Sequence, residues 1–207
     1  MRQNRKNKRF IYLISPNKIE NEDFYIKLNQ VLSSKKVSFF QLRLKKESII
    51  NKIYIGKKIK KICKKYQVKF LINDDPILAK RVNADGCHLG QKDMNISKAR
   101  KILKNKIIGI TCHNSINLVK QAIKSRPNYI ALGAFYSSKT KKVKFKANIQ
   151  ILKYVKTMTK IPIVVIGGIK SNNYKKLLLN KANFLAISGY IWNNKKLKPI
   201  EAINKLK

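Results

Sequence analysis

Eight short apolar runs recur along the chain, and stretches with helical spacing separate them. Most of the runs are continuously apolar rather than alternating, which is typical of parallel strands that are buried on both faces. The stretches between them carry apolar residues on one side and lysines on the other, as amphipathic helices do. The sequence therefore predicts eight strands, over residues 10–15, 38–43, 69–74, 86–90, 107–112, 129–134, 161–168 and 184–190.

The strict alternation of strand and helix indicates a parallel sheet that is joined by helical crossovers. Eight such units favour closure into a single (β/α)8 TIM barrel, an α/β fold, over an open sheet of the flavodoxin type, which stays the alternative. Neither a linker nor a change of composition divides the 207 residues, so one domain over residues 1–207 is expected. Residues 1–9 are strongly basic and are expected to form a solvated tail.

The charge of the chain is extreme, with 48 lysines and arginines against 9 acidic residues and a formal net charge of +39. Such a field attracts nucleic acid, anionic membranes and phosphorylated metabolites. The excess is nearly all lysine and is scattered over every expected helix, whereas nucleic-acid readers favour arginine and interleaved aromatic residues. Lysine, asparagine and isoleucine have AT-rich codons, so a biased genome explains the charge more simply. We expect small phosphorylated substrates and no specific nucleic acid, with a basic nucleic-acid-binding barrel as an alternative.

The three cysteines form no C-x-x-C pair, which indicates a reducing cytoplasm and no disulfide framework. The dipeptides Cys87-His88 and Cys112-His113 invite a zinc site. Adjacent residues on a strand point to opposite faces, however, so one member of each pair would face away from a shared metal. The first apolar run ends at Pro16 and is too short for a signal peptide or a membrane span. The expected location is cytoplasmic, with no membrane partner.

Polar side chains gather where the expected strands end, which is the edge at which barrels of this kind hold their catalytic groups. After the second strand, Gln41, Arg43 and Lys45 stand at alternate positions and would share one face. A buried glutamine and arginine need partners, and an anionic substrate supplies one. Thr111 stands at the end of the fifth strand. These four residues are candidates for the active site.

Two carboxylates follow neighbouring strands in a chain that has only nine acidic residues. Asn73, Asp74 and Asp75 close the third strand, and Asp93 lies in the loop after the fourth. Asp74 and Asp93 would suit a Mg²⁺–phosphate site, because Mg²⁺ takes one or two carboxylates and completes its octahedron with phosphate oxygens and water. The alternative role is helix capping, for which Asp75, directly before Pro76, is the better placed residue.

Hydroxyl, lysine and glycine residues follow the later strands, where they suit a phosphate group. The loop after the sixth strand carries Ser138, Thr140 and Lys141, whose hydroxyl and ammonium groups can hold phosphate. The seventh strand ends in Gly168, and the eighth carries Ser188. The loops after these two strands form a recurrent phosphate site in barrels.

Taken in order, these motifs resemble the thiamine phosphate synthase family over residues 10–191. The most specific pieces are Gln41-x-Arg43-x-Lys45, residues 71–93, residues 107–114, Ser138-x-Thr140-Lys141 and residues 161–169. The resemblance implies an enzyme that joins hydroxymethylpyrimidine diphosphate to thiazole phosphate and releases thiamine phosphate and pyrophosphate. In that family the C–O bond to pyrophosphate breaks first, and the thiazole nitrogen captures the pyrimidine-stabilised cation.

The resemblance also implies a role for each candidate residue. Asp74 and Asp93 would hold Mg²⁺, the expected cofactor. The residues that would bind the diphosphate are Arg43, Lys45, Asn73 and Lys141. Those expected to act in catalysis are Arg43, Lys141 and Thr111. Those that would bind the pyrimidine, complete the site or take the thiazole phosphate are Gln41, Ser138, Thr140, Gly168 and Ser188.

The chain departs from the family pattern at a few positions. Leu44 stands where an acidic residue is frequent, Ser138 stands where threonine is usual, and Ala134 and Ser137 stand where prolines are frequent. The nearest alternative is the related thiazole tautomerase, an aromatase-like barrel without coupling activity, which places a catalytic histidine at the position of His113. That group tends to lose the metal carboxylates, and this chain keeps both, so the synthase is the favoured interpretation.

Overall fold

Eight parallel strands close into one barrel in the computed structural model, which describes residues 9–137 and 145–207. Each strand pairs with its neighbours in chain order, and β1 pairs with β8 to close the ring. The predicted (β/α)8 barrel is confirmed, and the alternative of an open sheet is wrong. The strands are β1 (Ile11–Ile14), β2 (Val37–Leu42), β3 (Lys69–Asn73), β4 (Gly86–Leu89), β5 (Ile107–His113), β6 (Tyr129–Gly133), β7 (Ile163–Ile166) and β8 (Phe184–Ile187).

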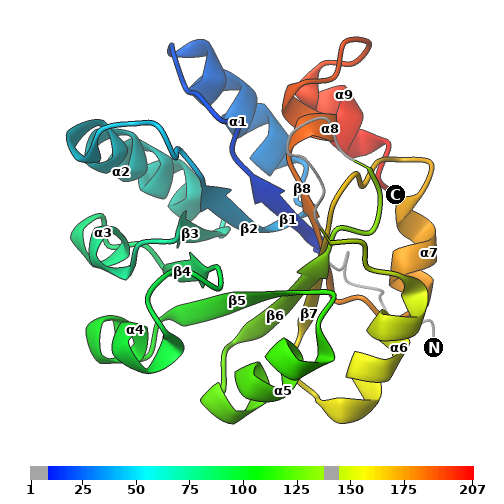
Figure 1. The fold of residues 1–207 in the computed structure, drawn as a ribbon. Coiled ribbons are helices and arrows are strands. Elements are labelled where there is room, and N and C mark those ends of the chain that lie inside the picture. The colour runs from blue at the N-terminus through cyan, green and yellow to red at the C-terminus, as the bar shows by residue number, and fades with distance from the viewer. Residues whose placement is uncertain (1–8, 138–144) are drawn as a thin grey trace, which may run out of the picture.

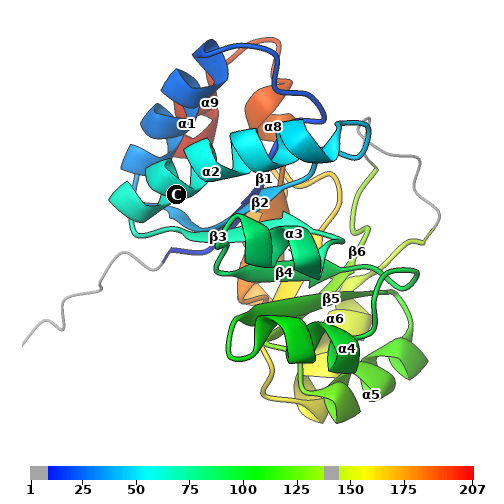
Figure 2. The same cartoon turned by 90° about the vertical axis from the view of Figure 1, so that its left-hand side faces the viewer.

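Helices surround the strands as an outer layer (Figure 1). In a side view α1 to α5 follow one another down one face of the molecule (Figure 2). The last helix, α9, packs beside α1 and so completes the layer. No helix in the described ranges is long and apolar enough to cross a membrane. The helices are α1 (Asp23–Ser33), α2 (Ile49–Lys65), α3 (Pro76–Arg81), α4 (Ile96–Leu103), α5 (Ile116–Ser125), α6 (Ile149–Met158), α7 (Tyr174–Leu179), α8 (Gly189–Trp192) and α9 (Pro199–Asn204).

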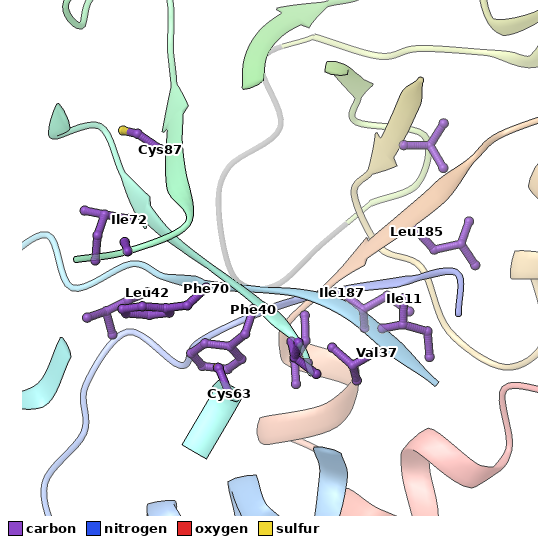
Figure 3. Close-up of a cluster of buried hydrophobic side chains, with 14 of the residues drawn as sticks. Ile11, Val37, Phe40, Leu42, Cys63, Phe70, Ile72, Cys87, Leu185 and Ile187 are labelled. Carbon is purple, nitrogen blue, oxygen red and sulfur yellow. The ribbon is translucent and has the colours of Figure 1, made fainter. Parts of the chain in front are cut away.

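The larger hydrophobic core lies between the strands and the helices. Alternate strand residues point outward into it, as Ile11, Phe40 and Phe70 do, and all three are fully buried. Cys63 of α2 packs into the same cluster (Figure 3). All three cysteines of the chain are free, buried thiols.

A smaller core fills the barrel itself. Its side chains include Tyr12, Leu71, Tyr129 and Val164, each of which alternates along its strand with residues of the outer core. This burial on both faces explains why the strands are continuously apolar in the sequence. Toward the C-terminal ends of the strands the inward positions become polar, and these positions form the floor of the candidate site.

β7 and β8 end two and three residues earlier than expected, whereas the ends of the other strands differ from expectation by one residue. β7 stops at Ile166 because Gly167 and Gly168 turn the chain, with φ of +108° and +59°. β8 stops at Ile187, and the residues expected to extend it form the short helix α8 from Gly189. Both changes move residues from a strand into the loops that border the site.

Arg9, which was expected to belong to the basic tail, is held against the barrel by hydrogen bonds. Arg9 Nη1 donates hydrogen bonds to the carbonyl oxygens of Tyr66 and Gln67, at 3.0 Å each. Ser38 Oγ donates to the carbonyl oxygen of Arg9 at 2.8 Å. Arg9 therefore belongs to the folded barrel, at the end opposite the strand C-termini, and its assignment to the tail is wrong.

Candidate active site

The candidate residues that the structure describes lie at the C-terminal ends of the strands or in the loops directly after them. Parallel strands bring these ends to one mouth of the barrel, so residues far apart in the sequence become neighbours. Ser138, Thr140 and Lys141 lie outside the described residues, and their expected roles stay predictions.

Gln41 and Asn73 form a hydrogen-bonded pair at this mouth, on the adjacent strands β2 and β3. Gln41 Nε2 donates a hydrogen bond to Asn73 Oδ1, and the Gln41 side chain is almost fully buried. In this orientation Gln41 presents Oε1 as an acceptor and Asn73 presents Nδ2 as a donor. The pair therefore offers a ligand one acceptor and one donor side by side.

Arg43 and Lys45 continue the same side of the chain beyond the end of β2. Leu42 and Leu44, which alternate with them, are buried in the outer core. Arg43 is half-buried, and Lys45 Nζ lies 3.0 Å from Asp74 Oδ2. Two cationic side chains therefore lie at the mouth. Leu44, which departs from the family pattern, packs in the outer core.

Asp74 and Asp93 lie at the same mouth, near enough for each carboxyl group to influence the other electrostatically. Burial is the main cause that raises the pKa of Asp93, and the neighbouring Asp74 raises it further. The N–H of Gly90, which donates to Asp93 Oδ2 at 2.6 Å, and the ammonium of Lys45 oppose this rise. Two carboxylates this close need a shared proton or a cation between them. The pair thus has the chemistry of a cation site.

Helix capping does not explain Asp74 or Asp93. The cap of α3 is Asp75, and the cap of α4 is Asn95; each side chain accepts a hydrogen bond of 2.9 Å from the N–H three residues further on. Asp74 has a φ of +67°, a conformation that aspartate and asparagine tolerate better than most residues. The expectation that Asp75 is the cap is confirmed.

A chain of polar side chains inside the barrel was missed in the sequence. The hydroxyl oxygens of Tyr12 and Tyr129 lie 2.8 Å apart, and the Tyr129 hydroxyl lies 2.8 Å from His88 Nδ1. His88 Nε2 lies 2.8 Å from Thr111 Oγ1. Cys87 is buried in the outer core, on the face opposite His88, as the alternation along the strand predicts. The same alternation marks His88 as an inward residue, which is the signal that could have identified it.

Burial sets the protonation states of these hydrogen-bonded side chains. Burial lowers the pKa of His88 to about 4, so its imidazole is neutral at neutral pH. Burial also raises the pKa of Tyr12 and of Tyr129, so both hydroxyls keep their protons. The rings of His88 and Tyr129 stack with centroids 5.6 Å apart. Gly109, which pairs with both residues, makes room for them, because a Cβ there would lie 1.9 Å from the Tyr129 ring.

Gly168 and Ser188 border the mouth in the loops after β7 and β8, which are adjacent strands. A Cβ at Gly168 would lie 2.2 Å from the carbonyl oxygen of Ser137, so both the positive φ and the lack of space require glycine. Ser188 Oγ donates a hydrogen bond to the carbonyl oxygen of Ser15 at 3.0 Å. Because this bond uses the hydroxyl proton, a phosphate group here would depend on backbone N–H groups.

A cavity of about 280 Å³ opens beside the ends of β2 and β3, and Lys45, Lys52, Asn73 and Asp74 are among the residues that line it. A broader, open hollow of about 800 Å³ lies elsewhere, between the start of α1 and the segment before α9. None of the predicted site residues that the structure describes lines this hollow. The smaller cavity therefore borders the mouth at Lys45, Asn73 and Asp74, on the side of the outer-core residues Leu42 and Leu44.

The model of the family described as thiamine monophosphate synthase matches residues 11–191. A thiamine-phosphate synthase of Pelagibacter ubique is 72% identical over 207 residues, which are 100% of both chains. One from Nitrosomonas eutropha is 36% identical over 86% of this chain and 84% of its own. Among solved structures, thiamine phosphate pyrophosphorylase from Pyrococcus furiosus superimposes with a TM-score of 0.84 at 25% identity, covering 97% of this chain and 94% of that one. With matches that span almost every residue, the chain belongs to the thiamine monophosphate synthase family.

Proposed function

We propose that the protein joins hydroxymethylpyrimidine diphosphate to thiazole phosphate, with release of pyrophosphate. The relatives named above support this activity, and the site contains groups that suit it. The observation that carries the proposal is the electrostatic interaction of Asp74 with Asp93 at the barrel mouth, where Lys45 Nζ lies 3.0 Å from Asp74 Oδ2. Paired carboxylates next to a cation suit a diphosphate bound together with a divalent metal.

Asp74 and Asp93 would hold Mg²⁺ in this proposal. The raised pKa of Asp93 supports this role, because a buried carboxyl beside a second carboxyl is poorly neutralised by the protein alone. When bound, Mg²⁺ would neutralise charge on the diphosphate and so favour its departure. Two carboxylates are as many as Mg²⁺ needs from the protein when phosphate oxygens supply further ligands.

The cationic side chains at the mouth would stabilise the leaving group. As the C–O bond breaks, its electron pair goes to the pyrophosphate, where negative charge grows. Fixed cations aimed at that charge lower the barrier more than they strengthen substrate binding. Arg43 and Lys45 follow the end of β2, with Lys45 Nζ 3.0 Å from Asp74 Oδ2, and Asn73 Nδ2 would add a neutral donor.

The pyrimidine would bind deeper in the barrel, where Gln41 and Thr111 lie. Carbon–nitrogen bond formation then requires the thiazole nitrogen to reach the cation before water does. The thiazole phosphate would be held by backbone N–H groups near Gly168 and Ser188, on the side of the mouth formed by β7 and β8. The two substrates would thus approach from different strands of one barrel.

The thiazole tautomerase is the second candidate, and His113 is the observation that favours it. His113 lies at the end of β5, has a φ of +52° and packs against Phe145 with ring centroids 4.5 Å apart. A histidine held at the mouth suits proton transfer. That chemistry has no need of the Asp74–Asp93 pair, which this site retains.

Incubation of the purified protein with both substrates separates the two candidates. We expect thiamine phosphate and pyrophosphate to form in the presence of Mg²⁺ and formation to stop when a chelator is added. His113→Gln is the matched variant, since it removes the proton-transferring group and leaves both carboxylates in place. The tautomerase would instead be established if the protein converted a thiazole tautomer without coupling it. That conversion should be lost in His113→Gln and should not change when the chelator is added.

A further inference from the structure

Four side chains form one unbranched hydrogen-bonded chain through the barrel interior. It runs from Tyr12 to Tyr129, then to His88 and finally to Thr111, with each heavy-atom distance 2.8 Å. Tyr12 and Tyr129 are buried, and Thr111 at the other end is partly exposed at the mouth. These four hydrogen-bonded side chains therefore connect the interior of the barrel to the candidate active site.

The buried end fixes the direction of the first hydrogen bond. In the ranges 9–137 and 145–207, the Tyr12 hydroxyl has one hydrogen-bond partner, the Tyr129 hydroxyl. If Tyr129 donated to Tyr12, the Tyr12 proton would be buried without an acceptor. Leaving a buried donor unpaired disfavours that arrangement by roughly tenfold or more. Tyr12 therefore donates, and the Tyr129 oxygen accepts.

The remaining directions follow from the first. Tyr129 receives the proton of Tyr12, so its own proton is directed to His88 Nδ1, which must be an unprotonated acceptor. The neutral imidazole then carries its single proton on Nε2 and donates it to Thr111 Oγ1. Thr111 accepts at its oxygen, which leaves its hydroxyl proton for another partner.

We propose that His88 and Tyr129 are positioning residues that make Thr111 a hydrogen-bond donor toward the barrel mouth. The partner would be an acceptor atom of a bound substrate, such as a ring nitrogen or a phosphoryl oxygen. This last step rests on the proposed function, whereas the direction of the hydrogen bonds rests only on the protein. A threonine alone can rotate between donor and acceptor roles; here the histidine removes that freedom.

The packing around the four hydrogen-bonded side chains holds them in this arrangement. Gly109 pairs with His88 on one side and with Tyr129 on the other, so it stands between the two strands that carry them. Any side chain at Gly109 would collide with the Tyr129 ring. The parallel stack of the two rings, at an interplanar angle of 11°, then holds the imidazole so that its two nitrogens meet two different partners.

The proposal is tested by the position of the imidazole proton, observed by nitrogen-15 NMR of the whole protein at neutral pH. The chain has two histidines, so the spectrum of His113→Gln identifies the signals of His88. We expect a protonated Nε2 and an unprotonated Nδ1. A proton on Nδ1, or on both nitrogens, would overturn the proposal whether or not the protein makes thiamine phosphate.

Two phenylalanine variants make a matched pair for the same spectrum. Tyr129→Phe removes the hydrogen bond to Nδ1 but leaves Thr111 as the acceptor of Nε2–H, so the Nε2-protonated form should persist while the nitrogen-15 signal of Nδ1 shifts. Tyr12→Phe leaves Tyr129 with His88 as its acceptor, so the form protonated at Nε2 should persist. Loss of that form in Tyr12→Phe would overturn the proposal, as would an unchanged Nδ1 signal in a folded Tyr129→Phe. If Tyr129→Phe does not fold, the wild type and Tyr12→Phe still decide.

Kinetic measurements test whether the Thr111 hydroxyl donates a hydrogen bond to the substrate. Thr111→Ser keeps the hydroxyl and should retain activity within a few-fold, whereas Thr111→Val keeps the shape and should lower kcat/KM by roughly tenfold or more. Equal activity of the two variants would show that the donor does not face the substrate. If neither the variants nor the wild type couples the substrates, the proposed function fails, and the NMR result still judges the hydrogen-bond chain.

Discussion

Replacing Tyr129 with phenylalanine removes a single oxygen from the barrel, yet it leaves two buried groups without partners. The Tyr12 hydroxyl loses its acceptor, and His88 Nδ1 loses its donor. An orphaned buried polar group costs roughly 1–3 kcal/mol, so we expect the free energy of unfolding to fall by about 2–4 kcal/mol. Tyr12→Phe removes one hydrogen bond but leaves Tyr129 bonded to His88, and should cost about 1 kcal/mol or less.

The double variant gives the sharper result. Adding Tyr12→Phe to Tyr129→Phe removes the orphaned Tyr12 hydroxyl, so the double variant should be more stable than Tyr129→Phe by about 1 kcal/mol. Urea unfolding of the four proteins, followed by circular dichroism, measures this difference. If the two substitutions were independent, adding Tyr12→Phe would lower the free energy of unfolding of Tyr129→Phe by as much as it lowers that of the wild type. That result would refute the reasoning.

Three further predictions concern the pH, the phosphate loop and the cationic mouth. The pKa of His88 is lower in the folded state, about 4 against 6.5, so the unfolded state binds more protons as the pH falls. The free energy of unfolding should therefore be highest above about pH 6.5 and decrease by at most about 3 kcal/mol on acidification to pH 4. In His88→Gln, urea titrations should show a smaller decrease over the same pH range. Gly168→Ala places a Cβ against the Ser137 carbonyl at a positive φ, so the KM for thiazole phosphate should rise more than that for the diphosphate substrate, and an equal rise would indicate general misfolding. Arg43→Ala should lower kcat by about 10²-fold with little change in thermal midpoint, whereas Arg81→Ala, on the exposed side of α3, should change neither, and an active Arg43→Ala would remove this residue from the mechanism.

The fold could be predicted because its determinants are local. Strands buried on both faces are continuously apolar, and each is followed by a segment with helical spacing. The strand ends were harder, because glycine conformation decides them. Gly167 and Gly168 end β7 by adopting positive φ, and the apolar run after β8 becomes the helix α8. An apolar run of this length does not distinguish a strand from a short helix.

The candidate site was predictable only in part. One rule, that chemistry gathers at strand C-termini, selects Gln41, Asp74 and Thr111 from the sequence. It cannot tell which of these residues touch, because contacts between strands depend on the register. The tyrosines of the interior chain come from β1 and β6 and look like core residues until the closed barrel brings their hydroxyls to 2.8 Å.

Three aspartate-to-asparagine variants, assayed for coupling at saturating substrates, test the central claim most directly. Asn keeps the size of the side chain and suits the positive φ of Asp74, but it removes the charge that a magnesium ligand needs. We predict that Asp74→Asn and Asp93→Asn each lose most of the formation of thiamine phosphate, with partial recovery at high Mg²⁺. Asp75→Asn is the matched control, because asparagine caps a helix as well as aspartate does, and it should retain activity. Full activity in both Asp74→Asn and Asp93→Asn would contradict the account.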